Sequence, residues 1–421
     1  MSTLRLSAIL PLLTAIGAFA AEPSPGEWTR FRGPNGTGIS PATGLPVKWT
    51  EADYNWKVKL PGTGHSSPVL WGDKLFITCG DRETAQRIIL CLKAADGSTL
   101  WERRYESKTH AVNQANSYAS STPALDADNL YVYWTTREEI TLVALDHDGK
   151  EVWRRTFGEF ISEHGSGASP IVLDDLVILP NDQEGNSSLI AVDRKTGADR
   201  WSIPRTTNKA AYGTPTVLLP EGGPPELILL CNGEGATSLD PKTGQLNWQL
   251  KDAFALRVVL SPVVGSGLVF GSCGVGGIAR RFVAIQPGSK KDGREPKIVW
   301  EQTKAIPYVP TPIAKDGLLF LWTDNGVVRC LRAATGEQLW EGRLQDLFYG
   351  SPVWAEGRLY CISRKGIVHV VAASPDKFEA LAANPLGEGS HATPAIARGT
   401  LYLRTFSHLI SIGGKKPASP Q

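Results

Sequence analysis

The sequence lacks several features that mark common classes of protein. It has one methionine in 421 residues, and no stretch beyond the first twenty residues reaches the roughly 20 apolar residues that a membrane-spanning helix needs. The formal net charge is only +2, which argues against a protein that binds nucleic acid through a basic surface. No cysteine pair has CxxC spacing and no histidine pair has HxxxH spacing, so we predict no metal site.

Cysteine is present but sparse. Cys79 and Cys91 flank a predicted hairpin turn at residues 81–86 and could pair across it if the protein is exported. The simpler interpretation is that most cysteines are small buried residues of the core. The six are Cys79, Cys91, Cys231, Cys273, Cys330 and Cys361.

The first 20 residues have the pattern of a signal peptide. Arg5 precedes a mostly apolar stretch at residues 6–19, and Ala18-Phe19-Ala20 fits a cleavage site. A buried N-terminal helix is the alternative. The first cysteine is Cys79, so we expect no lipid anchor. The pattern predicts a periplasmic or secreted protein without a membrane span.

The feature that is abundant is a repeat. A Ser/Thr-Pro dipeptide recurs every 40 to 55 residues, and each copy opens two short apolar runs separated by a Gly or Asp turn, which is the pattern of a β-hairpin. The copies are Ser67-Pro68, Thr122-Pro123, Ser169-Pro170, Thr214-Pro215, Ser261-Pro262, Thr311-Pro312, Ser351-Pro352 and Thr393-Pro394.

A tryptophan follows a Gly-containing turn with the same period. Units of roughly 47 residues and four strands, each too small to bury its own faces, are typical of propeller blades. The tryptophans in this position are Trp56, Trp101, Trp153, Trp201, Trp248, Trp300 and Trp340.

Eight units predict an all-β fold: a single eight-bladed β-propeller of four-stranded blades over residues 28–413, followed by a disordered tail at 414–421. The last unit has only three predicted strands. We expect residues 54–60 to supply the fourth strand and close the ring, which would leave no open edge. An open solenoid of the same hairpins is the alternative.

Two copies of the turn carry a family resemblance: AVDRKTGADRW from Ala191 and SLDPKTGQLNW from Ser238. They resemble the repeats of pyrroloquinoline-quinone (PQQ) dehydrogenases and of BamB, the propeller lipoprotein of outer-membrane protein assembly. The opening WTRFRGPNGTGIS from Trp28 is similar to secreted bacterial PQQ-like, BamB-like propellers. The chain lacks the adjacent cysteine pair of many such dehydrogenases and the lipid-bearing cysteine of BamB, so the resemblance implies the fold more firmly than either function.

We predict no catalytic residue. Asp146, Asp193 and Asp240 recur in the turn before the tryptophan, where they most simply accept backbone N–H bonds. Gly165-Ser166-Gly167 precedes a strand rather than a helix, unlike a hydrolase nucleophile turn. The sequence leaves catalysis open and favours a non-enzymatic protein without a cofactor. PQQ with calcium is expected only if the chain is a dehydrogenase.

The connections that precede the Ser/Thr-Pro copies should gather at one mouth of the central channel. Each carries a large polar or aromatic side chain, and we predict that these line a ligand or partner site. The alternative is that they only fill the channel and bond nearby carbonyls. The predicted site residues are His65, Tyr118, His164, Tyr212, Arg257, Tyr308, Tyr349 and His391. The longest connection, residues 106–119, is rich in Asn and Gln and could contribute.

The favoured function is that of an exported, monomeric scaffold or binding propeller that engages a cell-envelope protein or a small ligand at a channel mouth or a blade edge. One alternative is a PQQ-dependent alcohol or sugar dehydrogenase. Another is a carbohydrate- or envelope-binding module that uses exposed tryptophans such as Trp28 or Trp322.

Overall fold

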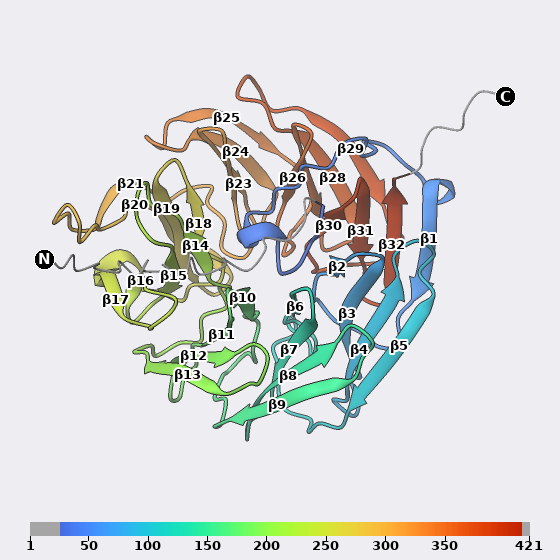
Figure 1. The fold of residues 1–421 in the computed structure, drawn as a ribbon. Coiled ribbons are helices and arrows are strands. Elements are labelled where there is room, and N and C mark those ends of the chain that lie inside the picture. Colours follow the sequence, from blue (N-terminus) through green and yellow to red (C-terminus); the bar gives the residue numbers. More distant parts are fainter. Residues whose placement is uncertain (1–25, 415–421) are drawn as a thin grey trace, which may run out of the picture.

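The structure is a computed structural model that describes residues 26–414; the predicted signal peptide and residues 415–421 of the predicted tail lie outside the described residues. Eight four-stranded antiparallel sheets form a ring around a central channel (Figure 1). This confirms the predicted eight-bladed all-β propeller. Apart from the strands, the described chain contains three short 3-10 helices: η1 (Pro34–Gly36), η2 (Glu51–Asp53) and η3 (Lys251–Ala253).

Seven blades consist of four consecutive strands, with the first strand beside the channel and the fourth at the rim (Figure 1). Blade 1 contains β2 (Val69–Trp71), β3 (Lys74–Gly80), β4 (Arg87–Lys93) and β5 (Thr99–Tyr105), and blade 2 contains β6 (Ala124–Leu125), β7 (Asn129–Thr135), β8 (Ile140–Asp146) and β9 (Glu151–Phe157). Blade 3 contains β10 (Ile171–Leu173), β11 (Leu176–Asn181), β12 (Ser188–Asp193) and β13 (Asp199–Pro204), and blade 4 contains β14 (Thr216–Leu218), β15 (Glu226–Cys231), β16 (Gly235–Leu239) and β17 (Leu246–Leu250). Blades 5 to 7 contain β18 (Val263–Gly265), β19 (Leu268–Val275), β20 (Ile278–Gln286), β21 (Lys297–Gln302); β22 (Ile313–Lys315), β23 (Leu318–Trp322), β24 (Val327–Arg332), β25 (Gln338–Arg343); and β26 (Val353–Ala355), β27 (Arg358–Ile362), β28 (Ile367–Ala372), β29 (Ala380–Pro385).

Blade 8 joins the two ends of the described chain. It contains β30 (Ala395–Ala397), β31 (Thr400–Arg404) and β32 (His408–Gly413), and its rim strand is β1 (Tyr54–Lys59). Strand β1 runs antiparallel to β32, with Trp56 opposite Ser411 and Val58 opposite Leu409. The predicted closure by residues 54–60 is therefore confirmed, and the solenoid alternative is wrong.

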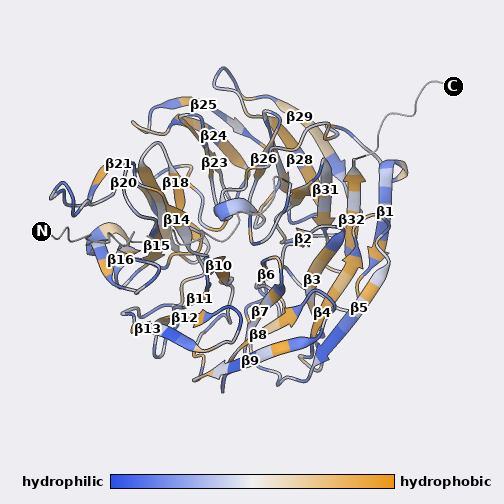
Figure 2. Cartoon of the chain, in the orientation of Figure 1, coloured by the Kyte–Doolittle hydropathy of each residue, from blue (hydrophilic) through white to orange (hydrophobic). Residues whose placement is uncertain are grey.

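The middle strands of each blade are apolar on both faces, because they pack between neighbouring blades, whereas the rim strands carry charge toward solvent (Figure 2). Strand β4 is buried along Arg87–Leu92, while β5, with the sequence TLWERRY, is mostly exposed. Together, these buried faces supply the apolar area that stabilises the ring.

The recurring tryptophan links each blade to the next. Trp153 of β9 donates its indole N–H to the Arg194 carbonyl of blade 3 at 3.0 Å, and its ring covers Gly197. Gly197 has φ +70°, and a Cβ there would lie 2.8 Å from the indole. The turn therefore needs glycine for both its conformation and its closeness to the ring. The same packing occurs at Trp56–Gly97, Trp101–Gly149, Trp201–Gly244 and Trp300–Gly336.

In blade 7, Ala382 stands where the other rim strands have tryptophan. It pairs with Val370 next to a register shift of the strands, which is also the place of the tryptophan in the other blades. Trp49, from the segment before β1, is buried in the hydrophobic cluster that includes Val370 and that Ala382 packs against. The Asn384 side chain holds this segment through the Trp49 amide at 3.0 Å and the Val47 carbonyl at 3.0 Å. A residue from outside the repeat thus packs where the repeat lacks its own tryptophan.

The Ser/Thr-Pro dipeptides form a hydrogen-bonded belt around the channel, which we call the anchor ring. In seven of the eight dipeptides, the Ser or Thr hydroxyl accepts a hydrogen bond from the preceding blade. The donor is the backbone N–H of that blade's own Ser or Thr, as in Ser67 N to Thr122 Oγ1 at 2.9 Å. Six further links of 2.9 to 3.2 Å continue as far as Thr393. The belt is open only between Thr393 and Ser67, whose Oγ has no hydrogen-bond partner within residues 26–414.

One mouth of the channel is closed by residues 27–40, the N-terminal plug. Figure 1 shows η1 of this segment at the centre of the ring. The plug bonds to the inner strands, or to the proline just before them, in blades 1, 2, 4, 6 and 7. Its contacts are Trp28 N to Leu70 O (3.3 Å), Leu125 N to Thr29 O (2.8 Å), Arg30 Nη2 to Pro215 O, Arg32 Nη2 to Pro312 O (2.6 Å) and Ser40 N to Trp354 O (2.9 Å).

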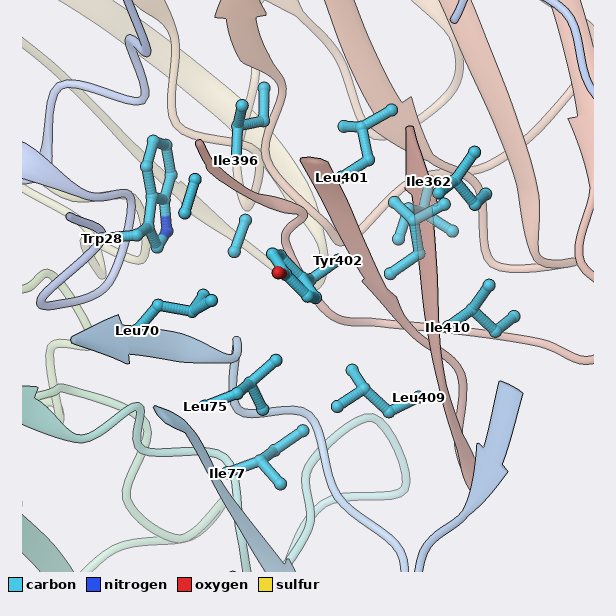
Figure 3. Close-up of a cluster of buried hydrophobic side chains, with 14 of the residues drawn as sticks. Trp28, Leu70, Leu75, Ile77, Ile362, Ile396, Leu401, Tyr402, Leu409 and Ile410 are labelled. Atoms are coloured by element: carbon cyan, nitrogen blue, oxygen red, sulfur yellow. The ribbon is translucent and has the colours of Figure 1, made fainter. Parts of the chain in front are cut away.

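Two expectations about side-chain exposure were wrong. Trp28 is 1% and Trp322 0% exposed. Trp28 packs in the plug near Leu70 and Ile396 (Figure 3), and Trp322 packs against Phe348 with the ring centroids 5.3 Å apart. Neither can serve as a platform for carbohydrate, because the repeat and the plug bury large apolar rings wherever blades meet.

The cysteines follow the simpler interpretation. All six are buried free thiols. Pairing between Cys79 and Cys91 is wrong, because Cys79 lies opposite Ile88 and Cys91 opposite Phe76 in the β3–β4 hairpin. No helix within residues 26–414 is long and apolar enough to cross a membrane.

Candidate functional site

The mouth opposite the plug opens into a cavity of about 540 Å³. Residues of the anchor ring line the cavity, and so does Phe31 of the plug. The plug therefore lies at the end of the cavity away from the open mouth. The structure brings seven of the eight predicted site residues to this cavity because each lies in the connection that leads into a blade. They are His65, His164, Tyr212, Arg257, Tyr308, Tyr349 and His391.

Tyr118 does not join them. Its hydroxyl donates to the His110 carbonyl at 2.7 Å and accepts the His110 amide at 3.1 Å, while the Arg87 guanidinium lies 4.6 Å from its ring centroid. The side chain thus braces its own connection beside the cavity, because residues 106–119 are long enough to fold back on themselves.

The same long connection supplies two cavity residues that the sequence did not single out. Asn113 and Asn116 both line the cavity. Asn116 Nδ2 donates to the carbonyls of His164 at 2.8 Å and Ser166 at 3.0 Å, which fixes the connection across blades 2 and 3. The Asn-rich composition was the signal, but it could not tell Asn113, beside the His164 ring, from the bracing Asn116.

One side of the cavity is aromatic. This aromatic wall consists of His65, Tyr349 and His391, with the His391 ring centroid 4.7 Å from His65 and 4.8 Å from Tyr349. Phe406 is not among the lining residues but packs against this wall, 5.1 Å from the His391 ring. Burial lowers the pKa of His65 to about 3, helped by His391 and Arg404, and lowers the pKa of His391 to about 4. Both imidazoles are therefore uncharged at neutral pH.

The opposite side carries hydrogen-bonding groups. This polar wall consists of Tyr212, Arg257 and Tyr308, which lead into blades 4, 5 and 6. Arg257 Nη2 donates to Glu184 Oε1 at 3.0 Å and reaches Glu163 Oε2 at 3.5 Å. Burial raises the pKa of Tyr308 to about 12 and also raises that of Tyr212, so both phenols keep their protons.

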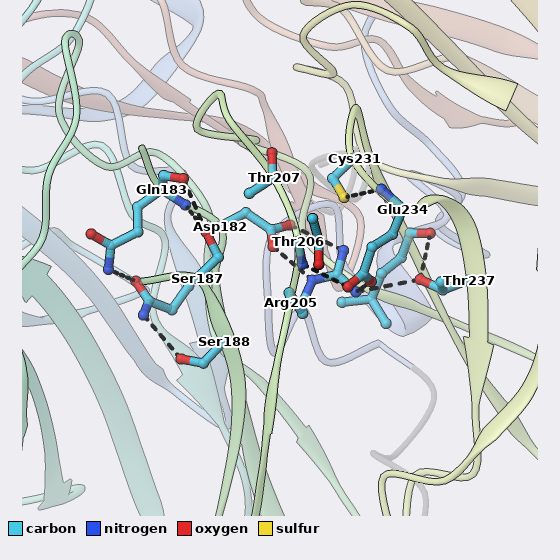
Figure 4. Close-up of polar contacts among 12 residues, drawn as sticks. Asp182, Gln183, Ser187, Ser188, Arg205, Thr206, Thr207, Cys231, Glu234 and Thr237 are labelled. Carbon is cyan, nitrogen blue, oxygen red and sulfur yellow. Dashed lines mark hydrogen bonds and ion pairs between the residues drawn. The ribbon is translucent and has the colours of Figure 1, made fainter. Parts of the chain in front are cut away.

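Buried networks hold the polar wall in place. Arg205, at the start of the connection that carries Tyr212, bonds Asp182 Oδ1 at 2.6 Å and Glu234 Oε2 at 3.0 Å (Figure 4). Asp324 accepts the amide of Tyr308 at 2.7 Å. Burial raises the pKa of Asp324 to about 6. These contacts position the backbone of two of the three residues.

The donor set does not match a calcium-bound quinone. Calcium requires several carboxylate or carbonyl oxygens, and the cavity lining that the structure describes contains no Asp or Glu. Nor do residues 26–414 contain a group of three or more His, Cys, Asp or Glu side chains that could hold a metal. The turn aspartates act as predicted: Asp193 Oδ1 accepts the amides of Lys195 at 3.0 Å and Thr196 at 2.9 Å.

Comparison with known proteins agrees with this architecture. The BamB of Yersinia pestis is 22% identical over 361 residues, which are 82% of either chain. The structure of BamB from Moraxella catarrhalis superposes with a TM-score of 0.58 at 16% identity, covering 86% of this chain and 98% of that one. A quinohemoprotein alcohol dehydrogenase from Comamonas testosteroni gives 0.64 at 13% identity, covering 95% and 82%. At such identities, the solved structures show the fold alone.

The family model described as outer membrane protein assembly factor BamB matches residues 85–302 and 291–412, which together make up most of the chain. This protein therefore belongs to the BamB-like family of PQQ-repeat propellers.

Proposed function

We propose that this protein is a non-enzymatic binding propeller of the cell envelope, which engages a ligand or a protein partner at the open mouth of its channel. The observation that supports this most is the cavity of about 540 Å³ at the open mouth, lined by the uncharged His65 and His391 and by tyrosines and amides on a ring of blades. The name of the BamB relatives, outer membrane protein assembly factor, supports a scaffold role in the envelope. The predicted signal peptide supports a periplasmic or secreted location.

The dehydrogenase alternative has the fold in its favour but not the chemistry of the cavity. Oxidation of an alcohol needs a base within hydrogen-bonding reach of the substrate hydroxyl. The lining residues within the described chain offer only His65, His164 and His391 for that role, and burial keeps the pKa of His65 and His391 far below neutral. No carboxylate of the lining could hold calcium beside a quinone.

A calorimetric titration of the purified mature protein with PQQ, with and without Ca²⁺, tests the choice between the two. We expect no saturable heat and no dye reduction with ethanol or glucose. Calcium-dependent binding together with dye reduction would make the protein a dehydrogenase and refute the proposal.

A triple variant tests the place of binding. Tyr212→Phe, Tyr349→Ala and His391→Ala together should abolish the capture of envelope proteins that the wild type retains in cross-linked extracts, while the melting temperature stays within a few degrees. The matched control is Tyr105→Phe, whose hydroxyl bonds Glu151 between two rim strands. A triple variant that captures the same proteins would place the interface elsewhere. A variant that unfolds would show that these side chains are structural.

A further inference from the structure

The two walls of the cavity face each other across the ring. Arg257 leads into blade 5 and His65 into blade 1, so they are separated by half of the eight blades and lie on opposite sides of the channel. A ligand between them meets flat rings on one side and O–H and N–H groups on the other. Such a ligand needs an apolar face and a polar edge.

The lining itself carries little unpaired charge. Arg257 is the one Lys or Arg among the lining residues that the structure describes, and it is ion-paired with Glu184 and Glu163. The histidines of the aromatic wall are uncharged. Arg404 and Arg364 lie next to this wall but are not among the lining residues. A charged ligand would therefore lose its hydration without meeting an unpaired Lys, Arg, Asp or Glu of the lining.

Polar side chains on both walls can bond a ligand. His65, Asn113, Tyr212, Arg257 and Tyr308 line the cavity and offer ring nitrogen, amide, hydroxyl and guanidinium groups. Such a set suits a partner that brings hydroxyl groups.

The plug crosses the channel at the end of the cavity away from the open mouth, and its Phe31 lines the cavity. A ligand therefore enters from the open mouth, as the end of a chain or a small molecule can do. A volume of about 540 Å³ suits a ligand of about one or two sugar rings.

From these contacts we propose that the cavity binds the non-charged end of a glycan, with the C–H face of a sugar ring on the aromatic wall and its hydroxyls on the polar wall. This inference rests on the proposed function, since it names the ligand class of the same cavity. The end of a peptide fits less well because it carries an ammonium or carboxylate group, which would meet no unpaired charged side chain among the lining residues.

The rim can extend the contact. Gly276 and Gly277, at the tip of the β19–β20 hairpin, line the cavity, and the flanking Val275 and Ile278 are 53% and 55% exposed. Apolar side chains at this place can pack on the C–H face of a second ring as it leaves the cavity.

The test is saturation-transfer NMR and calorimetry of the full mature protein with cellobiose, cellotetraose and N,N′-diacetylchitobiose, with digalacturonic acid as the charged counterpart. We expect at least one neutral sugar to bind saturably and the acidic sugar to bind at least tenfold more weakly. If the site takes a chain end, cellotetraose should match cellobiose to within about threefold, a difference of roughly 0.7 kcal/mol.

Matched variants locate the binding. Tyr212→Phe should weaken the binding of the neutral sugar about threefold to tenfold through the loss of one hydrogen bond. His391→Ala should weaken it further by removing the centre of the aromatic wall, and Tyr105→Phe, at the rim strands, should leave it unchanged.

The outcomes separate this inference from the proposed function. If no neutral sugar binds while envelope proteins are still captured through the same mouth, the glycan inference is wrong and the proposed function stands. If the acidic sugar binds better than the neutral ones, the charge argument is wrong. If neither sugars nor partners bind, both fail.

Discussion

The two mouths of the channel rest on the same anchor ring but are built in opposite ways. At the closed mouth, the plug crosses the channel, and Arg32 is fully buried with its guanidinium nitrogens all donating to backbone carbonyls. At the open mouth, aromatic and polar side chains of the connections surround a cavity of about 540 Å³. The closed mouth therefore serves the fold, whereas the open mouth is suited to a ligand.

The closed mouth should show the largest effect on stability. Arg32 donates to the carbonyls of Gly36 at 3.1 Å, Thr37 at 3.0 Å and Pro312 at 2.6 Å, and also to Thr311. Burial lowers its pKa to about 9, so the side chain stays charged at neutral pH. Arg32→Met should lower the free energy of unfolding by about 3 kcal/mol, since several charge-assisted bonds are lost and their acceptors stay buried. Urea unfolding measures the change.

The matched control for this experiment is Arg332→Met, because Arg332 is exposed and pairs only with Glu337 at the surface. It should change the free energy by at most about 0.5 kcal/mol. Equal losses in the two variants would mean that the plug does not contribute to holding the ring together.

The ring itself could be read from the sequence, because its repeat signals have local causes. Each Ser/Thr-Pro pair is fixed by the anchor ring, and each glycine before a tryptophan by the ring that covers it, as Gly197 is by Trp153. The three-stranded last unit also predicted that β1 would close the ring. Signals of this kind depend only on neighbouring blades.

The plug could not be read in the same way, because its contacts have no repeat. Arg32 bonds residues about 280 positions away in the chain, and nothing in the sequence around Trp28 shows that it crosses the channel. Phe31, as part of the cavity lining, was missed for this reason. Tyr118 was placed in the cavity because the fold of its long connection is not local.

Acid should lower the stability of the protein through groups at the open mouth rather than through groups at the closed one. His65 faces His391 and Arg404, and His391 faces Arg364, so acid adds like charges to this side. Their folded-state pKa values of about 3 and 4 lie below the ordinary 6.5. The unfolded chain therefore binds more protons, and stability should fall as the pH drops from 6.5 to about 4.

Asp324 opposes this trend. Its pKa is raised from 3.8 to about 6, so between these values the folded protein binds the additional proton and gains stability as the pH falls. The free energy of unfolding should be measured at pH 7, 6, 5 and 4. It should fall less toward acid pH in the double variant His65→Gln/His391→Gln than in the wild type. The histidine argument fails if the two profiles are parallel.

The smallest expected effect compares one glycine from each mouth. Gly277, in the rim hairpin, has φ +76° with no atom within 4 Å of an added Cβ, whereas Gly33, in the plug, has φ +65° and a Cβ would meet the Trp28 ring at 2.5 Å. Gly277→Ala should cost about 1 kcal/mol, the strain of a left-handed backbone alone. Gly33→Ala should cost clearly more, because Trp28 is held between blades and cannot move aside. Urea midpoints give both values. Equal losses would show that the rim hairpin is packed as tightly as the plug, which would leave the open mouth less free to receive a ligand than its cavity indicates.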